Sequence, residues 1–194
     1  MYAYLQGVFT YKSPAQVYIE VNGVGYEVNI SLNTYGAIQH IEKGKLYTYF
    51  QVKEDGHTLF GFFDKAEKEM FVLLISVSGV GASTARIMLS HMKPDEVQRA
   101  IAQGNVKLLE SIKGIGKKTA ERLVLELKDK VIKVSADSVI PVAASNSLQQ
   151  DALNALIALG ISKPIAESSI QKINLTQPNI TNLEELIKKA LKAI

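Results

Sequence analysis

The 194-residue sequence contains no cysteine, has no long apolar run and carries only a small excess of one charge sign. The absence of cysteine excludes disulfide bonds, thiolate zinc sites, iron–sulfur ligation and cysteine nucleophiles. No apolar run approaches the roughly 20 residues that a membrane-spanning helix needs. The first residues also lack the basic and apolar regions of a signal peptide. We therefore expect a cytoplasmic protein with no membrane segment.

Chemistry based on a bound metal, cofactor or nucleotide is not indicated either. The three histidines are scattered through the chain without metal-ligand spacing, so structural or surface roles are expected for them. A phosphate-binding loop of the ATPase type requires Ser or Thr after its Gly-Lys pair, but Lys118 follows Gly116-Lys117. We expect neither a metal ion nor a cofactor.

Positive charge is concentrated in the middle of the chain. The sequence has 22 Lys and Arg against 19 Asp and Glu, for a net charge of +3. Residues 64–133 hold thirteen basic and nine acidic side chains, whereas residues 1–63 hold four basic and five acidic ones. A basic segment on an otherwise balanced chain modestly favours a polyanionic partner. On charge alone, a solvated helix face explains the pattern equally well.

The first third of the chain alternates apolar and polar residues in the manner of β-strands. The alternation lies on both sides of the turn pair Asn22-Gly23, which predicts a β-hairpin. The alternating segments are 4–11, 17–21, 26–30, 46–52 and 58–62. Five short strands predict a small closed β-barrel of the OB type over residues 1–63, with other small barrels as alternatives.

The turn between the last two expected strands, Lys53 to His57, carries two adjacent acidic residues. Glu54 and Asp55 precede Gly56, and Asp-Gly is favourable turn chemistry. At a hairpin tip these residues would project two negative charges into solvent. From the residues alone, an ordinary polar turn is the simpler interpretation.

The remainder of the chain has helical periodicity. The helices expected within residues 64–133 are 65–77, 82–92, one that begins at Pro94, 107–112 and 117–132. The segment 134–147 is rich in Ser and Ala, includes Pro141 and shows no period, so we interpret it as a flexible linker. Residues 148–194 predict a small three-helix module, which is better suited to docking than to catalysis. The expected fold class is therefore α+β with several domains.

An internal repeat is the most informative motif. Ser78-Gly79-Val80-Gly81-Ala82-Ser83-Thr84-Ala85 is followed 35 residues later by Lys113-Gly114-Ile115-Gly116-Lys117-Lys118-Thr119-Ala120. Each copy lies between apolar helical segments, which predicts two helix-hairpin-helix units in tandem. The glycines allow a tight turn, and the first amides of the next helix are left unpaired at its positive dipole end. A phosphate oxygen is their natural acceptor, so such hairpins hold DNA backbone without reading bases.

A single glycine turn is common at helix ends, but two copies in the same context favour phosphate binding. Lys117 and Lys118 add charge to the second copy, whereas the first copy has Ser83 and relies on its amides and on Arg86. The residues expected to contact DNA backbone are Gly79, Val80, Gly81, Ala82, Ser83, Arg86, Gly114, Ile115, Gly116, Lys117, Lys118 and Thr119.

The whole chain resembles the RuvA family, the bacterial Holliday junction-binding subunits of the branch migration machinery. The resemblance is carried by IEVNGVGYEV at 19–28, KEDG at 53–56, LFGF at 59–62, SGVG at 78–81, KGIGKKTAERLVLELKD at 113–129 and ALIALGIS at 155–162. Barrel, twin hairpins, linker and three-helix module also follow the order found in the family. Ser83 and Arg86 depart from a lysine and an apolar residue in the family's first hairpin.

The resemblance implies a non-catalytic, homotetrameric or octameric protein that holds four-way DNA junctions open and flat in recombination, repair and the SOS response. It implies that the C-terminal module, ubiquitin-associated-like in fold, recruits the hexameric ATPase RuvB, and that the resolvase RuvC acts on the same complex. The partner-binding residues expected on this module are Leu156, Leu159, Gly160 and Ile161. Glu54 and Asp55 correspond to the family's acidic pin at the junction centre.

Two other functions remain as alternatives. A DNA glycosylase would use Lys118 as its catalytic lysine with Asp137 nearby, although Asp137 falls in the Ser/Ala-rich segment and no base-flipping pocket is suggested. A pure adaptor would act mainly through the C-terminal helices and would bind a partner without any affinity for DNA.

Overall fold

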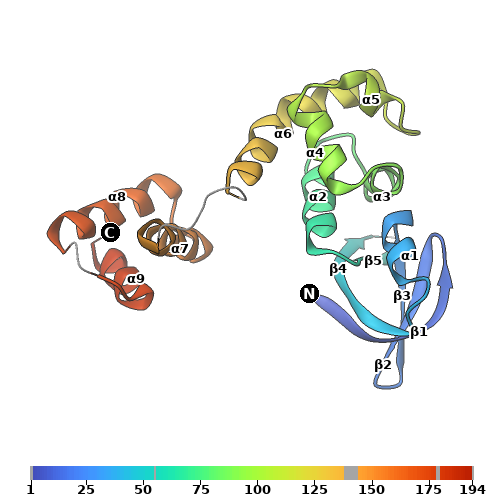
Figure 1. Cartoon of the computed structure of the whole chain (residues 1–194), viewed down its shortest axis with the longest axis horizontal. Coiled ribbons are helices and arrows are strands. Elements are labelled where there is room, and N and C mark those ends of the chain that lie inside the picture. The colour runs from blue at the N-terminus through green and yellow to red at the C-terminus, as the bar shows by residue number, and fades with distance from the viewer. Residues whose placement is uncertain (1, 55, 138–143, 178–179, 194) are drawn as a thin grey trace. The chain divides into compact units, whose positions relative to one another are not determined.

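The computed structural model describes residues 2–54, 56–137, 144–177 and 180–193, and the chain divides into two compact units, Met1–Asp137 and Ser138–Ile194. The first unit combines a β-barrel with a helical domain, and the second is a helical module (Figure 1). In the described ranges, no helix has both the length and the apolar character needed to cross a membrane.

Residues 4–62 form a closed five-stranded barrel, as the alternating pattern predicts. The strands are β1 (Tyr4–Ser13), β2 (Gln16–Val21), β3 (Val24–Ile30), β4 (Lys43–Lys53) and β5 (Gly56–Phe62). They follow one another around the barrel in the order β1-β2-β3-β5-β4, and only the β3–β5 pair is parallel. Asn22 and Gly23 both have positive φ, 50° and 83°, which forms the tight turn expected between β2 and β3. The OB-type prediction is confirmed.

A short helix, α1 (Leu32–Ile38), was not predicted from the sequence. It fills the connection between β3 and β4, and the Ser31 side chain caps it by accepting the Thr34 amide at 3.0 Å. At its other end, the Lys12 ammonium donates to the carbonyls of Ile38, Gln39 and Ile41 at 3.4, 3.0 and 2.9 Å. A cation at a helix C-terminus complements both the unpaired carbonyls and the helix dipole.

The helical domain follows directly from β5. Its helices are α2 (Lys65–Ile75), α3 (Ala82–His91), α4 (Pro94–Ala102), α5 (Val106–Glu110) and α6 (Lys117–Asp137). All five expected helices are present, and α6 is five residues longer than the predicted end at Ile132. Their apolar faces form one core, which Phe60 and Phe62 of β5 also enter. Phe71 of α2 connects the barrel to the helical domain, because the centre of its ring lies 5.2 Å from that of Phe60 and 4.8 Å from that of Phe62.

A buried carboxyl group reinforces this joint between barrel and helices. Glu67 of α2 is only 3 % exposed and accepts hydrogen bonds from the hydroxyls of Ser31 and Thr34, the latter at 2.7 Å. The Thr34 hydroxyl also accepts the Phe63 amide at 3.0 Å. Burial is the largest cause that raises the pKa of Glu67 above 4.5, and the two hydroxyls oppose it by stabilising the charged form.

The second unit contains three helices around a small core, in agreement with the sequence. They are α7 (Ala144–Ala158), α8 (Lys163–Thr176) and α9 (Leu183–Lys192), and Gly160, with φ of 90°, follows the end of α7. The buried core consists of Ala152, Leu156, Ala166, Ile170, Leu186 and Ala190. The predicted linker over 134–147 is too wide, since α6 continues to Asp137 and α7 already begins at Ala144. The remaining residues, 138–143, lie outside the described part of the chain.

The raised pKa of Glu67 predicts a specific pH dependence of stability. An acid whose pKa is raised by folding favours the folded state most below its unfolded value, about 4.5, and loses this contribution as the pH rises through the folded value. Relative to Glu67→Gln, the wild type should therefore gain unfolding free energy as the pH falls from 8 to 4. Urea unfolding of both proteins across this range measures the difference. Parallel stability curves would contradict the assignment.

Candidate nucleic-acid interface

The first glycine motif forms a tight turn between α2 and α3. Gly79 has φ of 93°, a conformation that is strained for residues with a side chain. The Val80 amide donates to the Val77 carbonyl at 3.0 Å, and the Val80 side chain is buried in the domain core. Gly81 then begins α3, and no side chain of the described residues caps this end. The first amides of α3 thus remain available to an external acceptor.

The second motif repeats this geometry bond by bond. Gly114 also has φ of 93°, and the Ile115 amide donates to the Ile112 carbonyl at 3.0 Å. The next helix opens in the same way, because Ala120 donates to the Gly116 carbonyl at 2.9 Å, as Ala85 does to Gly81 at 2.9 Å. The two copies of the predicted helix-hairpin-helix unit are therefore equivalent in backbone structure.

The two turns face each other reciprocally. A side chain at Gly79 would lie 3.8 Å from the hydroxyl of Thr119, and one at Gly114 would lie 3.8 Å from the methyl group of Thr84. Thr84 and Thr119 occupy the same position in the two copies of the repeat. The threonine of each copy thus lies beside the glycine of the other, which gives the pair a local two-fold relation. As a result, the starts of α3 and α6 are close neighbours.

Arg122 of α6 adds a contact between the copies that the sequence did not reveal. Its Nη1 donates to the Ser78 carbonyl in the first turn at 3.3 Å, and its Nε lies 3.6 Å from the carboxylate of Glu126. A bond from one hairpin to the loop of the other depends on their packing, so the spacing of the repeat alone could not predict it.

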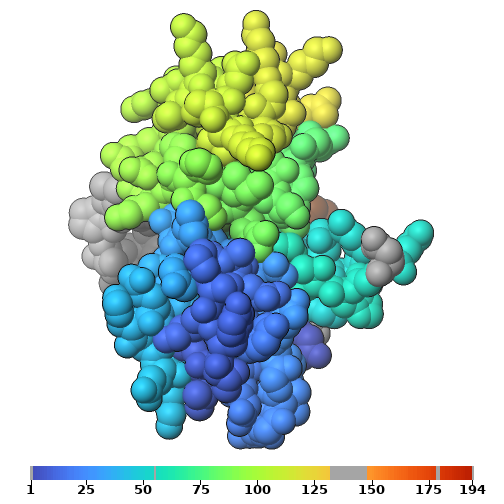
Figure 2. All heavy atoms as spheres, turned by 90° about the vertical axis from the view of Figure 1, so that its right-hand side faces the viewer, coloured from blue at the N-terminus to red at the C-terminus, as the bar shows by residue number. Residues whose placement is uncertain are grey.

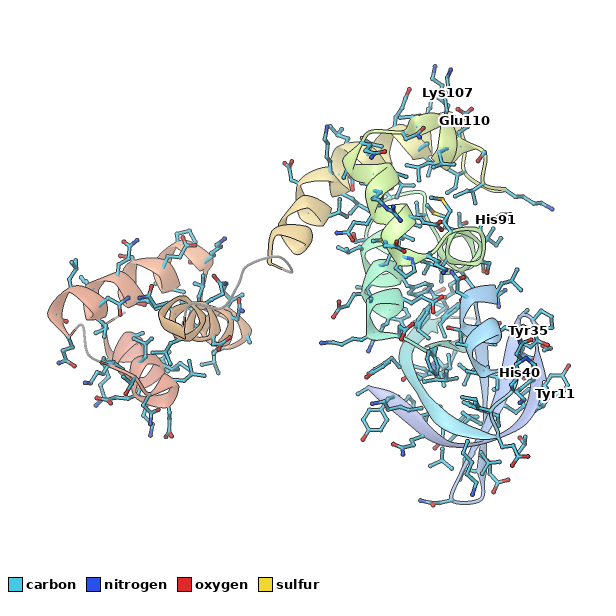
Figure 3. The ribbon with its side chains drawn as sticks, in the orientation of Figure 1. Tyr11, Tyr35, His40, His91, Lys107 and Glu110 are labelled. Atoms are coloured by element: carbon cyan, nitrogen blue, oxygen red, sulfur yellow. The ribbon has the colours of Figure 1, made fainter. Side chains whose placement is uncertain are left out.

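The exposed lysines of the two turns all lie on the second hairpin. Lys113, Lys117 and Lys118 are exposed, and the first turn of α6 contains no acidic residue. Figure 3 shows Lys107 and Glu110 extending from the nearby helix α5 into solvent. Cations near a helix N-terminus oppose the helix dipole, so Lys117 and Lys118 weaken their own helix. A bound anion would relieve this conflict, which makes this end of α6 the strongest candidate for a phosphate site.

Arg86, an expected backbone contact, also makes contacts with the barrel that the sequence did not reveal. Its guanidinium donates to the Ala15 carbonyl at 3.0 Å and to the Asn29 side-chain oxygen at 2.8 Å, both in the barrel. Partial burial lowers the pKa of Arg86. The side chain therefore connects α3 to the barrel. Among the described residues, its guanidinium donates to barrel residues. The structure thus brings the two glycine turns together and holds the guanidinium of Arg86 against the barrel.

The acidic turn stands at the tip of the β4–β5 ribbon. Lys53 and Gly56 are the last paired residues of the two strands, and Glu54 follows Lys53 as an exposed residue; Asp55 lies outside the described residues. Figure 2 shows this tip projecting sideways from the barrel (cyan), while long side chains from α5 and the start of α6 stand out at the top of the same view (yellow-green to yellow).

The residues predicted to bind a partner differ in accessibility within the second unit. Leu156 is fully buried and belongs to the core of the module, so it does not offer a contact surface. Leu159 is 63 % exposed, Gly160 is exposed and Ile161 is partly buried against the core. The exposed segment that follows α7 remains the candidate surface.

The glycosylase alternative requires a pocket beside Lys118. A groove of about 950 Å³ runs beside α2 and α4, but Lys118 is not among the residues that line it. In the described part of the chain, no group of three or more His, Asp or Glu side chains could hold a metal ion.

Comparisons with known proteins match the whole chain. Residues 1–61 match the family profile described as the RuvA N terminal domain, residues 71–129 a SAM-like helix-hairpin-helix tandem, and residues 147–194 the RuvA C-terminal domain. Proteins named Holliday junction branch migration complex subunit RuvA are similar over their full length. The one from Christiangramia forsetii is 50% identical over 100% of both chains, and that from Flavobacterium psychrophilum 48% over 99% of both. The Bacteroides fragilis protein is 41% identical over 100% of both chains.

The charge conflict at the start of α6 predicts that Lys118→Glu stabilises the isolated protein. The new carboxylate would complement the helix dipole and form a favourable i,i+4 pair with Arg122. We expect the unfolding free energy to rise by about 0.5–1.5 kcal/mol at low salt. Urea unfolding measures the change, with Lys128→Glu farther along α6 as the matched control. A loss of stability specific to Lys118→Glu would contradict the proposed conflict.

Proposed function

Because the chain belongs to the RuvA family, we propose that it binds four-way DNA junctions without sequence preference and serves as a non-catalytic subunit of a branch migration complex. The family membership rests on profile matches at both ends of the chain and on full-length relatives at 41–50% identity. These relatives favour junction binding over the glycosylase alternative. We infer that the protein acts in the cytoplasm on chromosomal DNA during recombination and repair.

The paired glycine turns are the observation that carries this proposal. The starts of α3 and α6 are adjacent, and each offers main-chain amides at the positive end of a helix dipole. Phosphates on a DNA backbone fit two such sites, and the exposed Lys117 and Lys118 strengthen the second. Contacts of this kind position the backbone and carry no base information, so binding should be independent of sequence.

The acidic turn acts in the opposite sense, at the centre of the junction. In the proposed homotetramer, or in two tetramers stacked as an octamer, Glu54 and Asp55 from four subunits would surround the point where strands cross. A carboxylate and a phosphate a few ångströms apart repel by about 1 kcal/mol in water and by more where water is excluded. Continuous duplex is therefore disfavoured across the centre, and strands are directed into separate arms. Repulsion of the wrong substrate adds to specificity.

The second unit supplies the connection to the motor. We propose that the exposed segment around Leu159 and Ile161 recruits the hexameric ATPase RuvB, while RuvC resolves the junction held by the same assembly. Its core of six small or medium-sized buried residues suits a docking module. Energy for branch migration then comes from the partner, and this chain contributes DNA geometry.

A binding assay with matched substrates tests the proposal. Gel-shift titrations should show tighter binding to a four-way junction than to linear duplex of the same length, at two salt concentrations. Lys117→Glu together with Lys118→Glu should weaken binding to junctions of every sequence and flatten the salt dependence, because fewer phosphate counterions are released. Lys128→Glu with Lys130→Glu, exposed on the same helix, is the charge-matched control. Equal affinity of the wild type for junction and duplex would overturn the proposed function.

The acidic turn gives a separate prediction. Glu54→Gln with Asp55→Asn removes the central repulsion, so affinity for linear duplex should rise by about fivefold or more while junction affinity changes little. Competition between labelled junction and unlabelled duplex measures the ratio. Replacement of Glu20 and Glu27 by Gln in the barrel provides the control for charge removed elsewhere. An unchanged junction-to-duplex ratio in the Glu54/Asp55 variant would exclude the turn from substrate selection.

A further inference from the structure

The two hairpins have the same backbone but different charge. Their turn hydrogen bonds correspond over the 35-residue repeat, and so do two side-chain bonds: the Ser76 hydroxyl donates to the Leu73 carbonyl and that of Ser111 to the Leu108 carbonyl, both at 2.7 Å. Both glycines have φ of 93°. Any difference in how the two turns hold a phosphate must therefore come from their side chains.

The side chains differ at the three positions where the second hairpin carries a lysine. In place of Lys113, Lys117 and Lys118, the first hairpin has Ser78, the buried Ala82 and Ser83. The difference has the opposite sign farther along, where Arg86 of α3 corresponds to the exposed Glu121 of α6. Ser83 is exposed at the position equivalent to Lys118. The first hairpin therefore offers amides and a hydroxyl, while the second offers amides and three flexible ammonium groups.

The two arginines near the first hairpin are held by contacts within the protein. Arg86 is one turn along α3, but its guanidinium is hydrogen-bonded to Ala15 and Asn29 in the barrel. Arg122 reaches the first turn from α6, where it donates to the Ser78 carbonyl and pairs with the carboxylate of Glu126 at 3.6 Å. Arg86 keeps its charge, because both of its acceptors are neutral, but its guanidinium is held against the barrel. Arg122 is held between the first turn and Glu126. Both arginines are thus held by contacts within the protein, in contrast to the exposed lysines of the second hairpin.

We propose that the hairpins divide the work of holding a moving DNA backbone: the second supplies most of the salt-sensitive affinity, and the first, which has no mobile lysine, is a weaker contact that releases each phosphate readily. This inference rests on the proposed function and specifies Ser83 as the residue that keeps the first contact weak. Each step of branch migration moves the backbone past its contacts, so every phosphate must leave its site before the next one enters. A lysine–phosphate contact adds ionic attraction that has to be overcome at each step, whereas an amide contact exchanges with water at lower cost.

The test adds to the first hairpin the charge that it lacks. Ser83→Lys should lower the Kd for a four-way junction by about fivefold or more and steepen the slope of log K against log salt by about 0.9 for each newly neutralised phosphate. It should also slow the exchange of homologous arms in a mobile junction saturated with the full-length protein. Lys118→Ser should have the opposite effect on all three measurements. Gln171→Lys, exposed on α8 of the second unit, is the control for added charge.

Each outcome decides one part of the inference. If Ser83→Lys behaves like Gln171→Lys in affinity and salt slope, the first hairpin does not hold backbone and the division of work is wrong. If affinity and slope rise but arm exchange keeps its wild-type rate, the weak contact has no role in movement and the proposal fails. Unchanged thermal unfolding of Ser83→Lys confirms that the variant is folded. Failure of the proposed function would appear differently, as a wild-type protein that does not prefer junction over duplex.

Discussion

The reciprocal contact between the two glycine turns is the constraint on which the DNA-binding surface depends. Thr119 lies beside Gly79 and Thr84 beside Gly114, at distances where a side chain on either glycine would meet its neighbour. The space would admit a β-carbon, but the positive φ at both glycines would strain any residue with a side chain. The packing of the two turns therefore sets the spacing of the two helix starts that we propose as phosphate sites. A single hairpin would offer one such helix start, whereas the packed pair holds two helix starts at a fixed distance from each other.

The joint between barrel and helices gives that surface its second component. Phe71 packs against Phe60 and Phe62, and the Glu67 carboxyl group accepts hydrogen bonds from the hydroxyls of Ser31, which caps α1, and Thr34 within α1. Arg86 adds a polar connection from α3 to the barrel. Apolar contacts supply most of the stability of such a joint, while buried polar groups are satisfied in only one arrangement and so favour a unique geometry. The acidic turn of the barrel and the basic hairpin consequently belong to one compact unit.

Features with a strong local signal could be predicted from the sequence, and those that depend on packing could not. Period-two alternation and the Asn22-Gly23 pair identified the strands, and the 35-residue repeat identified both turns. Helix α1 was missed because it has only seven residues, with Gly36 among them, and is stabilised by Ser31 and Lys12 from outside the helix. Glu67 lies in the charged segment that opens α2, where nothing distinguishes a buried carboxyl from a solvated one. The hydrogen bonds of Arg86 could not be predicted either, because they depend on how the barrel packs against α3.

The lysines at the start of α6 show how function can be recognised against the local rules of folding. Helices favour acidic residues in the first turn, and α4 follows this rule with Asp95 and Glu96. Helix α6 breaks it with Lys117 and Lys118, although the rest of its sequence is consistent with a stable helix. A conflict of this kind persists when a ligand compensates for it, and the compensating ligand here must be an anion. Since α3 has the same turn geometry without the conflict, the lysines are not a requirement of the fold, which is why we attribute them to the proposed binding of an anion.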